Sequence, residues 1–450
     1  MTPEQLDPPA PPPTAAPARS SMKFKTAAGV AIALGLAVGF VSSCGPSPDD
    51  GVIADRFPPL AAGEEAVLFG GDMLLANGVK EHMAEHGYDW MFRKTQPIFD
   101  SAQAKFFVGN QEGPITTRRS KGKPRGKWMY SQKPATIEAY VGAGFTHLSL
   151  ANNHALDRKR EGMMDTHKLL TKAGIVPFGG GPDAAAARKP IVLEVGGLNI
   201  GVLAGMEPWK RFREHQWDAA DDRAGVLLLS KEALASAVAE ARRGVDVLLA
   251  YPHWGANYVG VNKSQRRIAD RLVAAGVDAI VGHHSHAAQG FGTVDGVPVI
   301  WSLGNTAFGT AGRFGHDKHQ PGYGLLCRMV VANGRIDRFE LLPLRINNRL
   351  NDYQPRPMPV SEAHDKLKEF ASSEGGKVTL ERGVATLKVG ERKNPKPALG
   401  SAPVPARAPA PAPAPAPAAS DAPATPTAVP PADDAPAEAK KTAGPDAAAD

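Results

Sequence analysis

Carboxylate, amide and imidazole side chains occur along this sequence in five short clusters whose residue types suit divalent metal ions. The clusters contain Asp72; Asn110, Gln111 and Glu112; Asn152, Asn153, His154 and Asp157; His253; and His283, His284 and His286. Imidazole and carboxylate are ligands for Zn, Mn and Fe, and no cysteine lies in the clusters to make a soft thiolate site. Two such ions about 3.5 to 4 Å apart can clamp a phosphate ester and generate hydroxide from bound water. A histidine without metal can then protonate the leaving alcohol.

Each cluster alone has an ordinary explanation, because an aspartate after a strand often caps a helix and a lone histidine often packs in a core. The sequence contains no GxSxG elbow, no phosphate loop and no strand followed by GxGxxG, which disfavours nucleophilic-serine and nucleotide-binding chemistry. Trp254, in the string HWG, allows two interpretations: a platform that stacks on a sugar, or a buried packing residue.

Five apolar runs precede the clusters directly, and each predicts a strand. The predicted strands span 66–70, 105–109, 146–150, 245–251 and 278–282. The predicted helices lie near 76–86, 134–143, 161–173, 230–243 and 262–275. In open α/β sheets, ligands bind beyond the carboxyl ends of the strands, so the clusters should converge on one edge. Asp295-Gly296 and Asn333-Gly334 predict two tight hairpins, and the fold class is therefore α/β with mixed sheets.

Composition shifts divide the chain into six parts. They are a proline-rich extension or misassigned start (1–21), an export signal (22–44), a linker (45–64), one large domain (65–350), a small extension of that domain (351–393) and a disordered Ala/Pro-rich tail (394–450). The signal ends in VSSC, which resembles a bacterial lipobox with Cys44 as the acylated residue; a short membrane helix that stays attached is the alternative. Either way the domain is expected outside the cytoplasm, on the outer side of the cytoplasmic membrane or at an outer membrane.

Charge and cysteine content exclude some classes of protein. The 52 basic and 46 acidic residues give a net charge of +6, a mild bias that predicts no nucleic-acid partner. Two cysteines, Cys44 and Cys327, cannot build a disulfide framework, and Cys327 is expected to be a buried free thiol.

The motifs FGGDMLL, GNQEGPIT, LANNHALD, PHWG, VGHHSHAAQGF and WSLGN, in this order over about residues 66–310, resemble the CapA family of capsule and poly-γ-glutamate synthesis, within the calcineurin-like metallophosphatase superfamily. The resemblance implies a β-sandwich flanked by helices and two divalent ions, Mn, Fe or Zn. It implies the metal ligands Asp72, Glu112, Asn153, His253, His284 and His286, with Glu112 bridging. It also implies that His154 is the general acid and that Asp157 orients it.

Two positions depart from the superfamily pattern, and three others depart from what is common among nearer relatives. Leu74 stands where a histidine is usual, and Glu112 stands in place of a bridging aspartate. Among nearer relatives, leucine is common in place of Gln111, proline in place of Ser285, and glutamate in place of Asn257 after HWG. One metal position is therefore expected to be weaker than the other.

Two functions fit these observations. The first is a metal-dependent hydrolase or transferase acting on a phosphate ester or amide of an anionic envelope polymer such as poly-γ-glutamate. The second is a noncatalytic protein that holds the polymer or a synthase complex at the membrane. The basic run 118–127, with Arg118, Arg119, Lys121 and Lys123, is a candidate polyanion contact. It could instead lie against anionic lipid headgroups or be a solvated loop.

Overall fold

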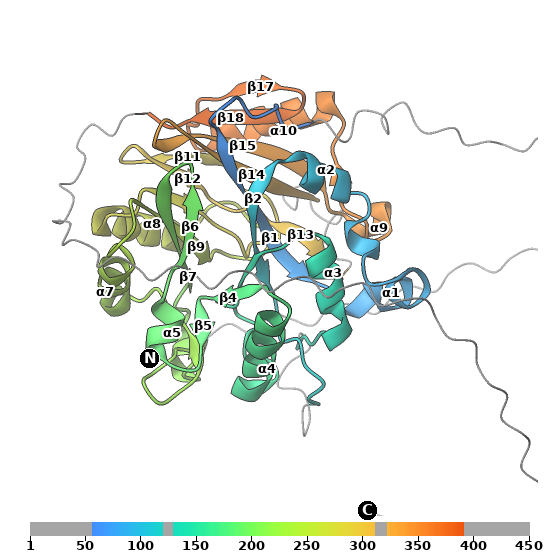
Figure 1. The fold of residues 1–450 in the computed structure, drawn as a ribbon, viewed down its shortest axis with the longest axis vertical. Helices are drawn as coiled ribbons and strands as arrows, with labels where there is room; N and C mark the ends of the chain where they lie inside the picture. Colours follow the sequence, from blue (N-terminus) through green and yellow to red (C-terminus); the bar gives the residue numbers. More distant parts are fainter. Residues whose placement is uncertain (1–55, 120–128, 311–321, 391–450) are drawn as a thin grey trace, which may run out of the picture. The chain divides into compact units, whose positions relative to one another are not determined.

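A computed structural model describes residues 56–119, 129–310 and 322–390 (Figure 1). The predicted lipidation site Cys44, the signal 22–44, the tail 394–450 and the basic residues Lys121 and Lys123 lie outside these ranges. Within them, no helix combines the length and the apolar character needed to cross a membrane.

The larger of two main sheets has a parallel half and an antiparallel half. Its strand order is β17-β18-β15-β14-β1-β2-β3-β4, with β13 beside β1 and β16 beside β15. The parallel strands are β1 (Glu65–Leu74), β2 (Ala104–Gln111), β3 (His147–Ser149), β4 (Val176–Phe178) and β13 (Asn305–Phe308). The antiparallel strands are β14 (Tyr323–Ala332), β15 (Arg335–Arg345), β16 (Arg356–Pro357), β17 (Thr379–Glu381) and β18 (Val384–Lys388).

The smaller main sheet has the order β11-β12-β10-β9-β7-β6. Its parallel centre is β7 (Leu198–Met206), β9 (Val247–His253), β10 (Ala279–Val281) and β12 (Val297–Ile300). The edge strands β6 (Ile191–Val195) and β11 (Phe291–Val294) are antiparallel to their neighbours, and β5 (Gly180–Gly181) pairs separately with β8 (Gly225–Val226).

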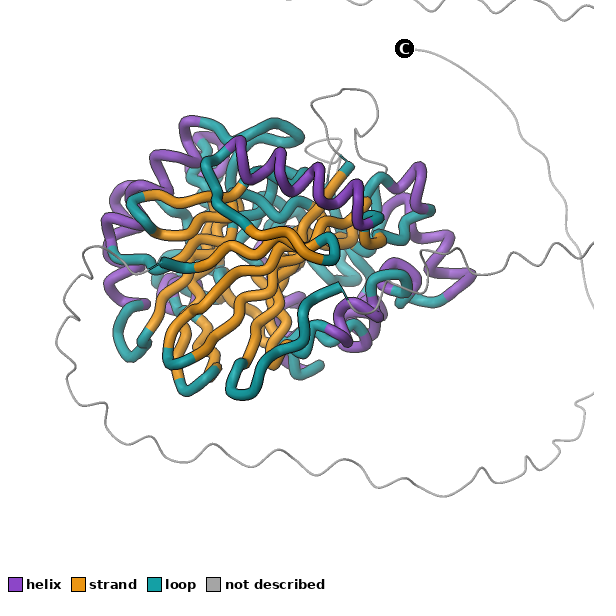
Figure 2. The backbone as a smooth tube through the Cα atoms, turned by 90° about the horizontal axis from the view of Figure 1, so that it is seen from above, coloured by secondary structure: helices purple, strands orange, loops and turns teal. Residues whose placement is uncertain are grey.

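The two sheets pack face to face, and successive side chains of β9 point alternately into two cores. Leu249 and Tyr251 belong to the core shared with the larger sheet, where the Tyr251 hydroxyl donates to the carbonyl of Gly70. Leu248 and Ala250 belong to a second core under α7 (Lys231–Ala241) and α8 (Lys263–Ala275). This period-2 alternation is that of a sheet covered on both faces. Figure 2 shows the layered strands with helices on either side.

Helices cover the outer face of the parallel half of the larger sheet. They are α1 (Lys80–His86), α2 (Gln96–Ser101), α3 (Ile137–Gly142) and α4 (Lys159–Lys172) (Figure 1). Phe99 and Tyr140 of these helices contact Phe107 and Phe145 beneath them. The remaining helices are α5 (Ala184–Arg188), α6 (Lys210–Glu214), α9 (Asn348–Asn351) and α10 (Val360–Ser373), the last packed on β11, β15 and β18.

The predicted fold class is confirmed: the chain forms mixed α/β sheets flanked by helices. All five predicted strands are present, and both predicted hairpins turn at residues with positive φ, 47° and 78° at Asp295 and Gly296 and 52° and 68° at Asn333 and Gly334. Cys327 is the buried free thiol that was expected, in β14, where burial raises the pKa of its thiol.

Candidate metal centre

Asp72 lies at the carboxyl end of β1, fully buried between the two sheets. Gly71 makes room for it: a Cβ on Gly71 would stand 1.8 Å from the carbonyl oxygen of Gly304, so only glycine lets the 304–306 segment approach. The backbone of that segment then accepts the Asp72 N–H at 2.9 Å. The carboxylate accepts from Asn110 Nδ2 at 2.8 Å and from the backbone N–H of His284 at 3.0 Å, which fixes both of its oxygens.

Glu112 follows β2 and is also fully buried. Its Oε1 lies 3.8 Å from His286 Nε2 and 3.8 Å from His154 Nε2. Neither carboxylate oxygen has a hydrogen-bond partner among the described residues. On the other side of His286, Nδ1 lies 3.6 Å from Asp72 Oδ2 and 2.9 Å from Asn305 Oδ1. Asp72, Glu112 and His286 thus form one cluster whose ligand atoms lie within 4.8 Å of one another.

A second cluster of the same kind joins Asp72 to His253 and His283. His253 ends β9, with Nδ1 3.8 Å from Asp72 Oδ1 and Nε2 2.8 Å from Asn153 Oδ1. His283 was not among the predicted ligands, although Val281 and His283 continue the inward face of β10, a period-2 signal that the sequence contains. Its ring packs at 4.2 Å on Tyr251, and neither ring nitrogen has a hydrogen-bond partner among the described residues.

The predicted ligand His284 lies beside this second cluster. Its ring centroid is 4.2 Å from that of His253 and 4.9 Å from that of Trp209. Its Nδ1 is buried without a partner in the described ranges. The backbone at His284 and His286 has φ of 101° and 56°, left-handed values that cost free energy at non-glycine residues and concentrate at functional sites.

His154 and Asp157 form a pair at the edge of the clusters. His154 Nδ1 lies 2.7 Å from Asp157 Oδ2, and that oxygen also accepts the Tyr130 backbone N–H at 2.6 Å. Because this oxygen already accepts the Tyr130 N–H, Nδ1 is assigned as the second donor to it, and Nε2 faces Glu112. Tyr130 covers the imidazole with its ring centroid at 4.2 Å.

A line of amides connects this pair to Asp72. The Asn152 side chain accepts the His154 backbone N–H at 3.1 Å and donates to Asn110 Oδ1 at 3.2 Å. Asn110 in turn donates to Asp72. These amides fix the candidate ligand Asp72 and its neighbours in position, as outer-shell partners do in metal sites.

Burial dominates the electrostatics of the clusters. Desolvation raises the pKa of Asp72 to about 7 against the opposing hydrogen bonds from Asn110 and His284. Desolvation, then the charges of Asp72 and Asp157, raise the pKa of Glu112 well above its usual value. Burial lowers the pKa of His253 and His284 far below the usual value, and that of His283 to about 3. Two buried carboxyl groups beside neutral imidazoles make a site that a cation would stabilise.

The donor set fits divalent metal ions on the chemistry of these atoms. Orphaned buried atoms are rare in folded proteins, yet here Glu112 Oε1 and Oε2, His253 Nδ1, both His283 nitrogens and His284 Nδ1 lack a partner among the described residues. All are metal-ligating atom types. Leu74, in the place of the missing histidine, is a fully buried apolar residue. The structure therefore brings together all eight predicted catalytic and metal-ligating residues and adds His283.

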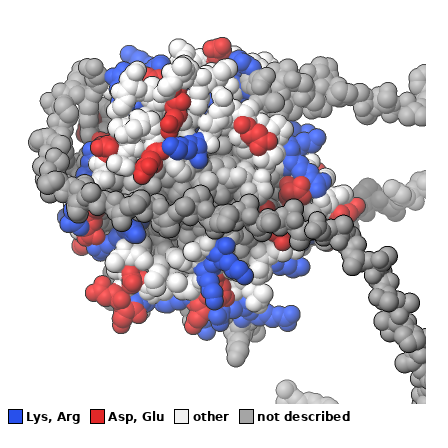
Figure 3. Space-filling model, in the orientation of Figure 1, with Lys and Arg blue, Asp and Glu red and all other residues white. Residues whose placement is uncertain are grey.

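The other two sequence candidates have different surroundings. Trp254 is fully buried and donates its indole N–H to the Trp301 carbonyl at 2.8 Å, so it is a packing residue and no sugar platform. Arg118 is exposed and paired with Asp165 of α4, with Nε 2.6 Å from Oδ2. Arg119 is exposed beside it. On the face drawn in Figure 3, basic and acidic side chains are interspersed.

The part of the chain that contains these residues is similar to known proteins. A family model described as "Bacterial capsule synthesis protein PGA_cap" matches residues 66–310. The PGA biosynthesis protein CapA of Bacillus subtilis (strain 168) is 29% identical over 304 residues, covering 67% of this chain and 74% of that protein. The capsule biosynthesis protein CapA of Bacillus anthracis is 28% identical over 307 residues, covering 67% and 70%. Among solved structures, the calcineurin-like phosphoesterase YfkN from Bacillus subtilis is similar at a TM-score of 0.36 and 13% identity, over 69% of this chain and 99% of that one. The family match spans more than half of the chain, which therefore belongs to the bacterial capsule synthesis protein family PGA_cap.

Proposed function

We propose that this protein acts in the synthesis, export or attachment of an anionic envelope polymer, such as poly-γ-glutamate, by metal-dependent hydrolysis or transfer. The relatives named for PGA and capsule biosynthesis support the polymer context. The observation that carries the chemistry is Glu112, a buried carboxylate whose two oxygens have no hydrogen-bond partner among the described residues and which lies between the imidazoles of His286 and His154.

Two divalent ions, of Mn, Fe or Zn, would be held by the residues of the two clusters. Asp72 and Glu112 would supply carboxylate oxygens, and His253, His284 and His286 imidazole nitrogens, with Asn153 and His283 beside them. Bound ions of this kind polarise a phosphoryl or carbonyl oxygen and lower the pKa of bound water.

The chain's own residues would handle the proton. His154, charged, would donate from Nε2 to the leaving group, while Asp157 holds Nδ1–H and keeps the ring in one tautomer. Tyr130 restricts the ring from one side and shields it from water. A noncatalytic polymer-holding protein would have no need of this oriented pair, so the pair favours catalysis over the alternative.

The domain would lie outside the cytoplasm, anchored to the membrane through an acylated Cys44. The support is the apolar segment that ends in VSSC in the sequence. An anchored domain would meet the polymer where it leaves the membrane, together with a synthase complex.

The deciding experiment is a metal-loaded activity screen of the full chain. Phosphodiester, phosphomonoester and γ-glutamyl amide chromogenic substrates are tested with Mn, Fe and Zn, and metal content is measured in parallel. Hydrolysis of one class that needs metal and disappears in Glu112→Gln supports the proposal. Glu232→Gln, an exposed carboxylate on α7, is the matched control and should keep full activity. Little bound metal and no hydrolysis of any class would replace the proposal with the polymer-holding alternative.

A further inference from the structure

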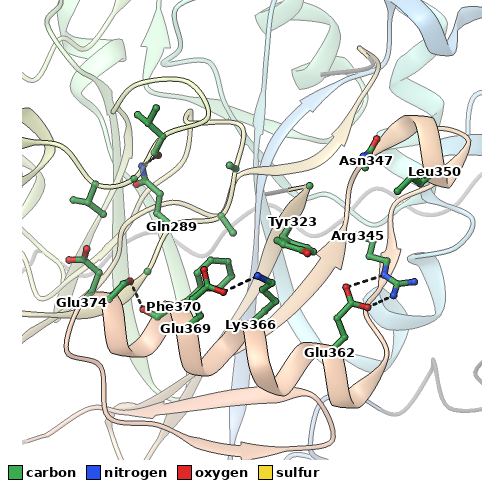
Figure 4. Close-up of a pocket in the computed structure, with 18 of the residues that line it drawn as sticks. Gln289, Tyr323, Arg345, Asn347, Leu350, Glu362, Lys366, Glu369, Phe370 and Glu374 are labelled. Carbon is green, nitrogen blue, oxygen red and sulfur yellow. Dashed lines mark hydrogen bonds and ion pairs between the residues drawn. The ribbon is translucent and has the colours of Figure 1, made fainter. Parts of the chain in front are cut away.

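A cleft of about 850 Å³ lies next to the metal centre and shares a wall with it. Ala287 and Ala288, which line the cleft, directly follow the ligand candidate His286. The Ala288 N–H donates to the Tyr323 carbonyl at 2.8 Å, which ties this wall to the end of β14. Figure 4 shows α10 along the opposite side, with Lys366 and Phe370 near Tyr323. Ligand pockets commonly measure about 300 to 1,000 Å³, so this volume can take several units of a flexible chain.

The charges in the cleft are mostly matched in pairs. Arg345 pairs with Glu362, and Lys366 Nζ lies 2.8 Å from Glu369 Oε2 (Figure 4). Glu374 pairs with Arg266, whose Nη1 lies 3.0 Å from Glu374 Oε2.

Arg356 is the exception. Among the described residues no carboxylate forms an ion pair with it, and its buried Nε has no hydrogen-bond partner. The register of the sheet adds electrostatic repulsion at Arg356, because Arg356 of β16 lies directly opposite Arg345 of β15. Opposite residues of an antiparallel pair share one face about 4.5 to 5.5 Å apart, where like charges destabilise each other. Glu362 thus pairs with Arg345 and not with Arg356, and the Arg345 side chain is still 42% exposed.

We infer that the cleft is a binding site for a carboxylate-bearing segment of the acidic polymer, held by Arg345 and Arg356. This inference rests on the proposed function, since it names where that polymer lies beside the metal centre. A guanidinium fork binds a carboxylate through two parallel hydrogen bonds, and a bound carboxylate would relieve the repulsion between the two arginines.

The acidic residues of the cleft narrow the ligand class. Glu362, Glu369 and Glu374 line the same cleft and repel any anionic group close to them, so the charges of the ligand should be separated by neutral atoms. A polymer with one carboxylate per unit and amide or apolar atoms between fits better, because Tyr323 and Phe370 offer aromatic surface and Asn347 offers an amide.

The test measures binding of a fluorescein-labelled decamer of γ-linked glutamate to the full chain by fluorescence anisotropy. Arg345→Gln/Arg356→Gln should weaken binding by about tenfold or more, as expected for the loss of charge-assisted hydrogen bonds. The control Lys368→Gln/Lys377→Gln removes the same charge from α10 and the loop after it, at positions that do not line the cleft, and should change affinity by less than about twofold. Metal content should stay unchanged in both double variants, which checks that the metal centre is still folded.

Equal affinities of the two double variants would overturn the inference, and so would displacement of the decamer by inorganic phosphate at lower concentration than by glutarate. Asp72→Asn separates this failure from that of the proposed function. Loss of hydrolysis with retained decamer binding in Asp72→Asn supports the cleft as a separate site, whereas loss of decamer binding in Asp72→Asn would assign binding to the metal centre and overturn the cleft.

Discussion

His154 Nε2 lies 3.8 Å from Glu112 Oε1 while its Nδ1 is bonded to Asp157 at 2.7 Å. The His154 imidazole therefore faces the Asp72–Glu112–His286 cluster through Nε2 and is held by the Asp157 carboxylate through Nδ1. The role of a general acid and the role of a ligand predict different results when His154 is replaced.

Replacing His154 by Gln should leave bound metal in place and lower hydrolysis by about 10² to 10⁴, the usual range for a lost general acid. Asp72→Asn should lower bound metal substantially, because Asp72 belongs to both clusters. Metal analysis of the purified variants, with hydrolysis rates alongside, distinguishes the roles. Equal metal loss in both variants would make His154 a ligand, and full metal retention in both would dismiss the site.

The close approach at Gly71 gives a prediction about how Asp72 is positioned. Gly71→Ala should destabilise the fold by about 1 to 3 kcal/mol, because its Cβ would meet the Gly304 carbonyl at 1.8 Å. It should also lower bound metal, since Asp72 is the next residue.

Gly142→Ala is the control for that variant. A Cβ at Gly142 of α3 meets nothing within 4 Å, so stability should change little or rise by up to about 1 kcal/mol. Chemical denaturation and metal analysis measure both effects. Wild-type stability and metal content in Gly71→Ala would contradict the crowding argument.

The five strands and their polar ends could be predicted because each cluster follows an apolar run, and parallel strands bring their carboxyl ends to one edge. The pairing of β13 with β1 could not, because Asn305 meets Asp72 across a β-bulge that no local pattern announces. Pairing with β2 continues to Met73 and pairing with β13 to Leu74, so Asp72 lies within the strand, although the prediction ended the strand at residue 70.

Other elements were missed although their signals were present. The alternation of 191–206 around Gly196-Gly197 indicates the β6–β7 hairpin, and both glycines have positive φ. Arg356 could be recognised as a candidate only from the register of β15 with β16, two segments separated by helix α9. Sequence spacing alone does not give that register.

Stability should depend on pH through His147, a buried residue of β3 that is not one of the candidate ligands. Burial lowers the pKa of His147 to about 4. The folded state therefore favours neutral imidazole, and the associated stability is present above the unfolded pKa of about 6.5 and is lost as pH falls toward 4. Between these pH values the wild type should lose up to about 3 kcal/mol of unfolding free energy that His147→Phe does not lose. The unfolding free energies of both proteins are measured by urea denaturation across this pH range. The same pH dependence in both would contradict this assignment.

Membrane attachment should depend on Cys44. If acylation at the end of VSSC anchors the chain, Cys44→Ala should release the domain from the membrane or block processing of the signal. Fractionation with gel mobility measures both outcomes, and Cys327→Ala, which removes the buried thiol of β14, serves as the control that stays anchored. Membrane-bound Cys44→Ala with normal mobility would show that the anchor is a retained helix.

The basic run that begins at Arg118 gives a final prediction, in which its residues have unequal roles. Arg118 already pairs with Asp165, so Arg118→Glu should mainly place two like charges together and cost up to about 1 kcal/mol of stability, the scale of an exposed pair. Arg119 is exposed and forms no ion pair with a described carboxylate. The triple variant Arg119→Glu/Lys121→Glu/Lys123→Glu should therefore weaken binding of γ-linked glutamate more than Arg118→Glu does.

The salt dependence identifies the cause. Steering by exposed charges is screened over about 8 Å at physiological salt, so the loss in the triple variant should be large at 20 mM salt and small at 300 mM. The Arg345→Gln/Arg356→Gln loss should persist at 300 mM, because hydrogen-bonded contacts in a cleft are screened less than exposed charges. Anisotropy titrations of wild type, triple variant and cleft variant at both salt concentrations, with metal content as the check on folding, compare the two. If the triple variant keeps the affinity and salt dependence of the wild type, the basic run is a solvated loop and the cleft alone contacts the polymer.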